Sequence, residues 1–96
     1  MSPDKLKKLI KLRKSLDKLD NSFIKLVKKR TEIVKKVLEI KEYKNQIVDK
    51  KRINVILRHI RRKSIKNKID PNITKRIWKN MIWSYIDFER KLFKKK

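Results

Sequence analysis

The sequence predicts an all-α fold with one long, one short and one medium helix. The chain of 96 residues has no glycine, whereas β hairpins and strand–helix loops normally use glycine in their turns. It has only two prolines, Pro3 and Pro71, and each lies where a helix can begin. Apolar residues recur at spacings of three and four along the chain, as they do on one face of a helix. We therefore expect a single helical domain over residues 1–96.

The first helix is expected over about residues 4–42, with a continuous heptad pattern that we call the heptad seam. The seam consists of Leu9, Leu12, Leu16, Leu19, Phe23, Leu26, Arg30, Ile33, Val37 and Ile40. A helix of about 38 residues is about 57 Å long, whereas a compact domain of this size has a radius of gyration of about 12–13 Å. The seam therefore needs a cover, which we expect to be a second copy of the chain in an intertwined helical bundle. An extended coiled coil or an arm that binds another protein is the alternative.

Two further helices are expected, over about residues 49–66 and about residues 72–93. Asp49 is a candidate N-cap for the first of them, and Asp70 or Asn72 for the second, because a short polar side chain can accept a free backbone N–H there. The expected apolar faces are Ile53, Ile56, Leu57 and Ile60 in one helix, and Ile73, Ile77, Met81, Ile82, Tyr85, Phe88 and Leu92 in the other.

The formal net charge of +22 has two interpretations, a polyanionic partner or a bias of composition. Lysine is spread along the whole chain, and the aromatic residues lie in the apolar stripes rather than among the basic residues, so we expect no nucleic-acid partner. No apolar run is long enough to span a bilayer, and the first residues lack the apolar stretch of a signal peptide. We therefore expect a cytoplasmic protein with no membrane partner.

The sequence offers no covalent or metal chemistry that we recognise. It has no cysteine, no glycine-rich phosphate loop and no zinc-ligand spacing, and its single histidine, His59, has no partner at motif spacing. We expect neither a metal nor a cofactor.

Charged residues interrupt the apolar faces at two places. Arg30 lies in the heptad seam, and Lys41, eleven residues further on, falls about 20° away on the same helix face. Glu89 lies on the apolar face of the last helix. Each charge either forms a structural ion pair or belongs to a site that binds a ligand inside the bundle, because a buried charge without a partner is costly.

These positions fall into a series that resembles a known family. The segment LIKLRKSLDKLDNSFIKLVKKRTEIVKKVLEIK resembles the first helix of the all-helical, type II chorismate mutases, with Arg13, Asp17 and Asp20 followed by Arg30 and Lys41. The segment QIVDKKRINVIL resembles that family's stretch at the start of the second helix. The resemblance covers about residues 6–93. It implies an enzyme that rearranges chorismate to prephenate, in the shikimate pathway that supplies phenylalanine and tyrosine, and that works as a homodimer with shared active sites.

The resemblance also implies roles for individual residues. Arg30 would bind the ring carboxylate of chorismate, while Lys41 and Arg13 of the partner subunit would bind the enolpyruvyl carboxylate. Lys41 and Glu89 would hydrogen-bond the ether oxygen. The reaction is pericyclic, so it needs no nucleophile, metal or cofactor. Lys41, Glu89 and Arg30 are thus the expected catalytic residues.

Three further substrate-binding residues follow from the same resemblance. Asp49 would help to place the ring hydroxyl, Arg52 would add to the cationic wall, and Tyr85 lies where many relatives have a small hydroxyl residue near the ring carboxylate.

Two residues depart from the usual mutase pattern. Ile53 replaces a common glutamate, and Tyr85 replaces the small hydroxyl residue; both changes also occur in the related isochorismate-pyruvate lyases, whereas Asp49 favours a mutase. The alternatives to a mutase are therefore a lyase of the same fold and a non-enzymatic basic protein that binds nucleic acid.

Overall fold

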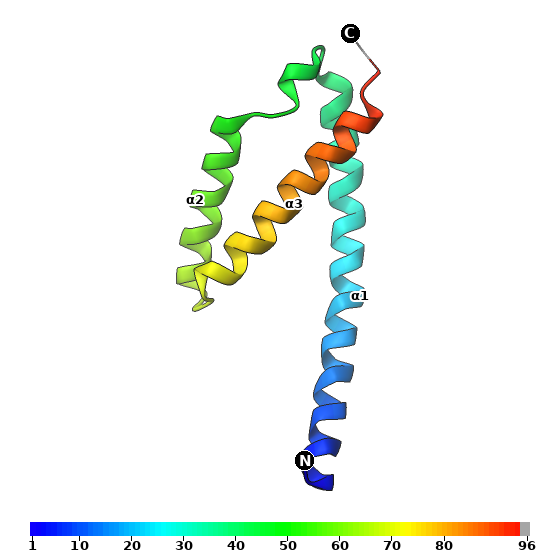
Figure 1. Ribbon diagram of the computed structural model, residues 1–96, viewed down its shortest axis with the longest axis vertical. Helices are drawn as coiled ribbons and strands as arrows, with labels where there is room; N and C mark the ends of the chain where they lie inside the picture. The colour runs from blue at the N-terminus through cyan, green and yellow to red at the C-terminus, as the bar shows by residue number, and fades with distance from the viewer. Residues whose placement is uncertain (95–96) are drawn as a thin grey trace. The chain divides into compact units, whose positions relative to one another are not determined.

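The computed structural model describes residues 1–94, which form three α-helices joined by two short connections (Figure 1). Helix α1 spans Pro3–Ile40, α2 spans Lys50–Lys66 and α3 spans Pro71–Leu92, and a short 3-10 helix, η1, spans Lys44–Gln46. No strand occurs in the described part of the chain, so the predicted all-α class is confirmed. Each observed helix begins and ends within two residues of its expected bounds.

The chain divides into two compact units, Met1–Ile33 and Val34–Lys96. The first unit consists almost entirely of α1. Ser2 caps its first turn, since its Oγ accepts the backbone N–H of Lys5 at 3.3 Å. Six seam residues of this unit are between 53% and 63% exposed: Leu12, Leu16, Leu19, Phe23, Leu26 and Ile33. In the described residues this apolar face is therefore largely exposed.

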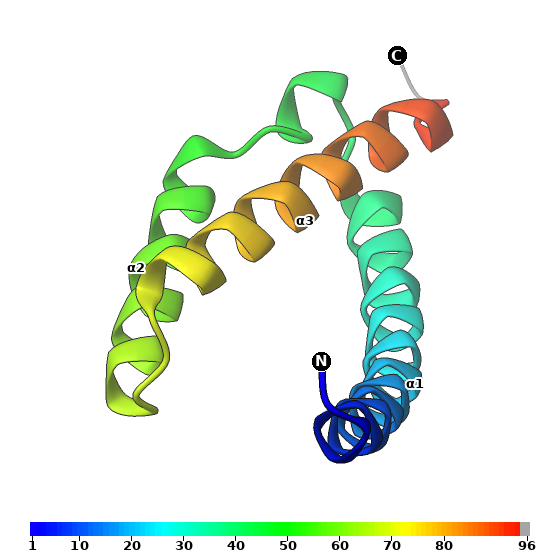
Figure 2. The ribbon, with the colours of Figure 1, turned by 60° about the horizontal axis from the view of Figure 1, so that its bottom comes forward.

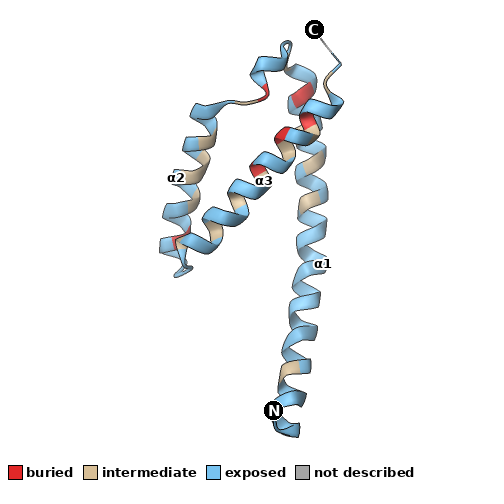
Figure 3. Ribbon diagram, viewed as in Figure 1, coloured by how far each residue is buried: buried red, intermediate tan, exposed pale blue. Residues whose placement is uncertain are grey.

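The second unit holds the last turns of α1, the connection 41–49, α2 and α3. Helices α2 and α3 form an antiparallel hairpin that is closed at residues 67–70, as the views in Figures 1 and 2 both show. Its small core contains Leu38 from α1, Ile47 from the connection, and Ile82 and Ile86 from α3 (Figure 3). Because these residues come from three segments, the core holds the end of α1 and the connection against the C-terminal half of α3.

The predicted caps begin the two shorter helices. The side chain of Asp49 accepts the backbone N–H of Arg52 at 3.0 Å, and the side chain of Asp70 accepts that of Asn72 at 2.9 Å. Pro71 then starts α3, at a position where a missing N–H costs nothing. The carboxylates therefore satisfy backbone donors that have no partner inside the helix.

A buried pair of hydroxyl groups joins the two helices near the closed end of the hairpin. Ser64 is 2% exposed, and its Oγ donates to the carbonyl of Ile60 at 2.6 Å and lies 2.7 Å from Oγ1 of Thr74. Lys68 in the turn takes a left-handed conformation, with φ of 57°, in a chain that has no glycine for this purpose. The hydroxyl pair thus fixes the end of α2 against the start of α3.

The predicted apolar face of α3 was wrong at both ends. Ile73, Ile77 and Leu92 are 57%, 43% and 41% exposed, whereas Ile86, which was not predicted to lie on this face, is 4% exposed. The reason is that the core meets α3 only around residues 82–89, where the end of α1 and the connection pack against it.

Candidate active site

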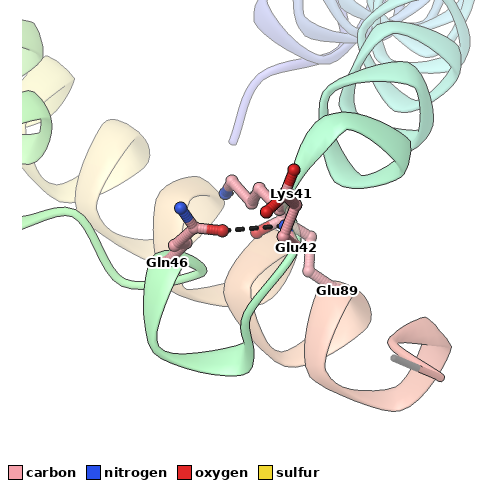
Figure 4. A network of polar contacts seen from close by, with 4 residues as sticks. All are labelled: Lys41, Glu42, Gln46 and Glu89. Atoms are coloured by element: carbon pink, nitrogen blue, oxygen red, sulfur yellow. Dashed lines mark hydrogen bonds and ion pairs between the residues drawn. The ribbon is translucent and has the colours of Figure 1, made fainter. Parts of the chain in front are cut away.

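A buried ion pair lies at the edge of the core, between the end of α1 and the last turns of α3. Nζ of Lys41 lies 3.5 Å from Oε1 of Glu89, and the side chains are 20% and 8% exposed (Figure 4). A carboxylate this deeply buried requires a partner, because water no longer solvates it. The structure therefore brings together two of the residues that interrupted the apolar faces.

Helical spacing explains why these two residues meet. Glu89 follows Ile82 and Ile86 by steps of four and three, so it lies on the buried face of α3. Lys41 follows buried Leu38 by three residues and is the first residue after α1. The core that Leu38 and Ile86 share therefore places both charged side chains at its border.

Helix α1 ends two residues earlier than expected because of Gln46. Oε1 of Gln46 accepts the backbone N–H of Glu42 at 2.8 Å (Figure 4). The same oxygen accepts the backbone N–H of Tyr43 at 2.9 Å. These two N–H groups therefore bond to a side chain instead of to carbonyl groups of α1. Gln46 was not among the predicted functional residues, although a glutamine three residues after the start of a helical turn is one half of a capping box.

An open pocket of about 720 Å³ lies beside Lys41, within the second unit. Its lining is Ile40, Lys41, Asn45, Gln46, Val48, Asp49, Lys50 and Lys51. Three lysines and one carboxylate give this lining a net positive charge, which favours a small anion. The pocket brings together Lys41 and Asp49, and the N-cap bond uses one of the two carboxylate oxygens of Asp49.

The other expected site residues differ in how closely they approach the pair. Tyr85 is half-buried one turn before Glu89, with its ring edge-on to Phe88 at a centroid distance of 6.4 Å. Arg52 is exposed in the first turn of α2. Arg13 and Arg30 are exposed on α1 within the Met1–Ile33 unit, so their part in the site stays a prediction.

A second cavity, of about 310 Å³, lies between α2 and α3 and contains none of the predicted site residues. Its lining is Asn54, Leu57, Arg58, Ile60, Arg61, Pro71 and Lys75. Within residues 1–94, no group of three or more histidine, aspartate or glutamate side chains could hold a metal ion. No helix among the same residues combines the length and apolar character needed to cross a membrane.

Comparison with known proteins assigns the chain to a family. The family model described as "Chorismate mutase type II" matches residues 12–90, which include both members of the Lys41–Glu89 pair. Comparisons with curated proteins and with solved structures give no significant match. The matched range covers most of the chain and extends from α1 through nearly all of α3. The chain therefore belongs to the type II chorismate mutase family.

Proposed function

We propose that this protein is a chorismate mutase, which rearranges chorismate to prephenate for the synthesis of phenylalanine and tyrosine in the cytoplasm. The observation that carries the proposal is the Lys41–Glu89 pair, a cation and a carboxyl group at the edge of the core beside an open cationic pocket. Membership of the family supports the same reaction type.

The proposed reaction suits a site without a nucleophile. The enzyme must hold chorismate in a compact conformer and stabilise the negative charge that grows on its ether oxygen as the C–O bond breaks. Nζ of Lys41 would donate to that oxygen, and a preorganised donor of this kind lowers a barrier by about 3–4 kcal/mol. Fixing the reactive conformer contributes further, because the substrate no longer has to reach it by chance.

Glu89 would provide the second contact to the ether oxygen. Its carboxyl group can donate a hydrogen bond only when protonated, and in the structure it contacts Lys41. Substrate binding would therefore have to separate the pair and leave a proton on Glu89. This requirement makes the activity of the proposed enzyme sensitive to pH.

The two carboxylates of chorismate require more cations than Lys41 alone. Arg30 would bind the ring carboxylate, and Arg13 of the partner subunit would join Lys41 on the other one. A homodimer supports this arrangement, since the exposed heptad seam needs a cover and a second copy carries the same apolar face. Asp49 and Arg52 would place the ring hydroxyl and complete the cationic wall.

A second candidate is an isochorismate-pyruvate lyase, which Ile53 favours. Ile53 is half-buried and packs against the core, so this position supplies no polar group to a substrate hydroxyl. Asp49 favours the mutase because its carboxylate lines the pocket beside Lys41. The two activities differ in their substrates and products, so they can be separated directly.

The test is a product assay on the purified chain with chorismate and with isochorismate. We expect prephenate from chorismate and no salicylate from isochorismate. Salicylate and pyruvate without prephenate would assign the chain to the lyases. Turnover of neither substrate by a folded protein would reject both proposals.

A further inference from the structure

We propose that Gln46 is a positioning residue for Lys41. Its amide oxygen fixes the backbone immediately after α1, so that the lysine side chain reaches the pocket and Glu89. This role deepens the proposed function and rests on it, because Lys41 matters catalytically only if the pocket rearranges chorismate.

The side chain of Gln46 accepts two short hydrogen bonds from the backbone. The backbone N–H groups of Glu42 and Tyr43, the two residues after Lys41, lie 2.8 and 2.9 Å from the same oxygen. The backbone N–H of Gln46 also donates to the carbonyl of Tyr43 at 3.0 Å. Gln46 therefore holds the turn through both its side chain and its backbone N–H. The turn begins one residue after Lys41.

The orientation of the Gln46 amide follows from its partners. Both partners are N–H donors, so the oxygen must face them and the NH₂ group must point away. A residue with an acceptor at this position can preserve the turn, whereas a residue of similar length without an acceptor cannot. This difference separates the role of the oxygen from that of side-chain bulk.

A buried residue lies on either side of the turn. Leu38, three residues before Lys41, is 8% exposed, and Ile47, the residue after Gln46, is 4% exposed. Both belong to the same small core. Between these two anchors the backbone of residues 41–46 is largely at the surface, and Gln46 supplies the hydrogen bonds that hold it in one conformation.

Gln46 also lines the pocket beside Lys41. Gln46 lines the same cavity as Lys41 and Asp49, so a change in the turn moves the wall that carries the lysine. Nζ of Lys41 is 3.5 Å from Glu89, at the outer limit of a hydrogen bond, so a small shift of the lysine backbone breaks this contact. A misplacement of about 1 Å can cost about 100-fold in rate.

The test compares Gln46→Met with Gln46→Glu, because both have nearly the length of glutamine and only the glutamate keeps an acceptor oxygen. For Gln46→Met we expect kcat to fall by roughly 10- to 100-fold, since Lys41 is displaced. For Gln46→Glu we expect kcat within about threefold of the wild type, with a higher KM because the added charge repels an anionic substrate. Lys44→Met is the control, an exposed side chain in the same turn outside the pocket lining, and should leave kcat unchanged.

Amide hydrogen exchange supplies a readout that does not depend on turnover. Exchange at Glu42 and Tyr43 should accelerate in Gln46→Met and stay slow in Gln46→Glu, while the helical circular dichroism of all variants stays the same. A folded Gln46→Met with wild-type kcat, or a Gln46→Glu with kcat as low as Gln46→Met, would overturn the proposal. If the wild type turns over no chorismate, the proposed function fails separately, and unchanged exchange in Gln46→Met would then reject the positioning role too.

Discussion

The two parts of α1 carry the same heptad seam, but only the second part contributes a residue to a core. The heptad seam continues from Leu9 to Ile40 without a change of spacing. The seam is mostly exposed in both units, with Val37 at 44% and Ile40 at 80% in the second, whereas Leu38, the one buried residue of α1, lies beside the seam and packs into the core of the second unit. The chain's own core therefore uses a residue of α1 that the heptad pattern does not include, and the seam itself still needs a cover.

The residues of the proposed active site also come from both units. Lys41, Asp49 and Glu89 lie in the unit that has a core, and their positions follow from that core and from N-capping. Arg13 and Arg30 lie on the exposed part of α1. If a partner chain covers this part, we expect the same contact to bring Arg13 of the partner subunit to the site.

The largest effect is expected in the second unit, from Lys41→Met. Loss of the donor to the ether oxygen should lower kcat by roughly 100- to 1000-fold. Steady-state formation of prephenate measures this loss, and circular dichroism checks that the helices remain. Lys36→Met, an exposed change on α1, is the matched control and should change kcat little. A folded Lys41→Met variant with near-normal kcat would exclude the proposed role of Lys41.

The next largest effect is expected from Leu19→Lys, a change in the heptad seam on the exposed part of α1. If a second copy covers the seam, a charge at this buried contact should weaken the dimer and lower activity at low protein concentration. Sedimentation at several concentrations measures the change in mass. Asn21→Lys, on the other side of the same helix, serves as the control. Equal behaviour of the two variants would show that the seam is not the dimer contact.

A moderate effect is expected from Glu89→Gln. Glutamine can donate to the ether oxygen at any pH, whereas glutamate can donate only in its protonated form. The variant should therefore stay active, and its rate should vary less between acidic and alkaline pH than the rate of the wild type. A folded Glu89→Gln protein without activity would reject a hydrogen-bond donor at this position.

The smallest effect is expected on stability, from substitutions of two serines, one in each unit. Ser64→Ala removes a buried hydroxyl with two hydrogen-bond partners and should lower the free energy of unfolding by about 1 kcal/mol. Ser15→Ala removes an exposed hydroxyl that bonds the carbonyl of Lys11 at 3.4 Å, and it should change stability by less than about 0.5 kcal/mol. Thermal unfolding measures both. Equal effects would contradict the difference in burial between the two units.

The sequence was a good guide wherever structure depends on local spacing. The three helices and the caps at Asp49 and Asp70 follow from periodicity and from short polar side chains before each helix. Glu89 stood out because an acid on an apolar helix face needs an explanation. Its pairing with Lys41 was suggested by the family resemblance, since no periodicity relates residues on different helices.

The features that were missed depend on contacts between segments. Ile47 is buried although it lies outside every α-helix, so a search for helical faces could not find it. Gln46 acts through a turn of irregular backbone, where no apolar period exists. Ile73 and Ile77 fit the apolar period of α3 but lie beyond the reach of the core. Periodicity thus identified the face of a helix but not the length of that face that is covered.

The central proposal is that one active site combines arginines of α1 from two chains with residues of the second unit. Mixing inactive Arg13→Ala with inactive Arg30→Ala tests it most directly, because a mixed dimer keeps one site with both arginines. Random pairing at equal amounts should restore about a quarter of the wild-type activity, since half of the dimers are mixed and each has one intact site. No recovery, in a mixture shown by mass spectrometry to contain mixed dimers, would contradict a shared active site.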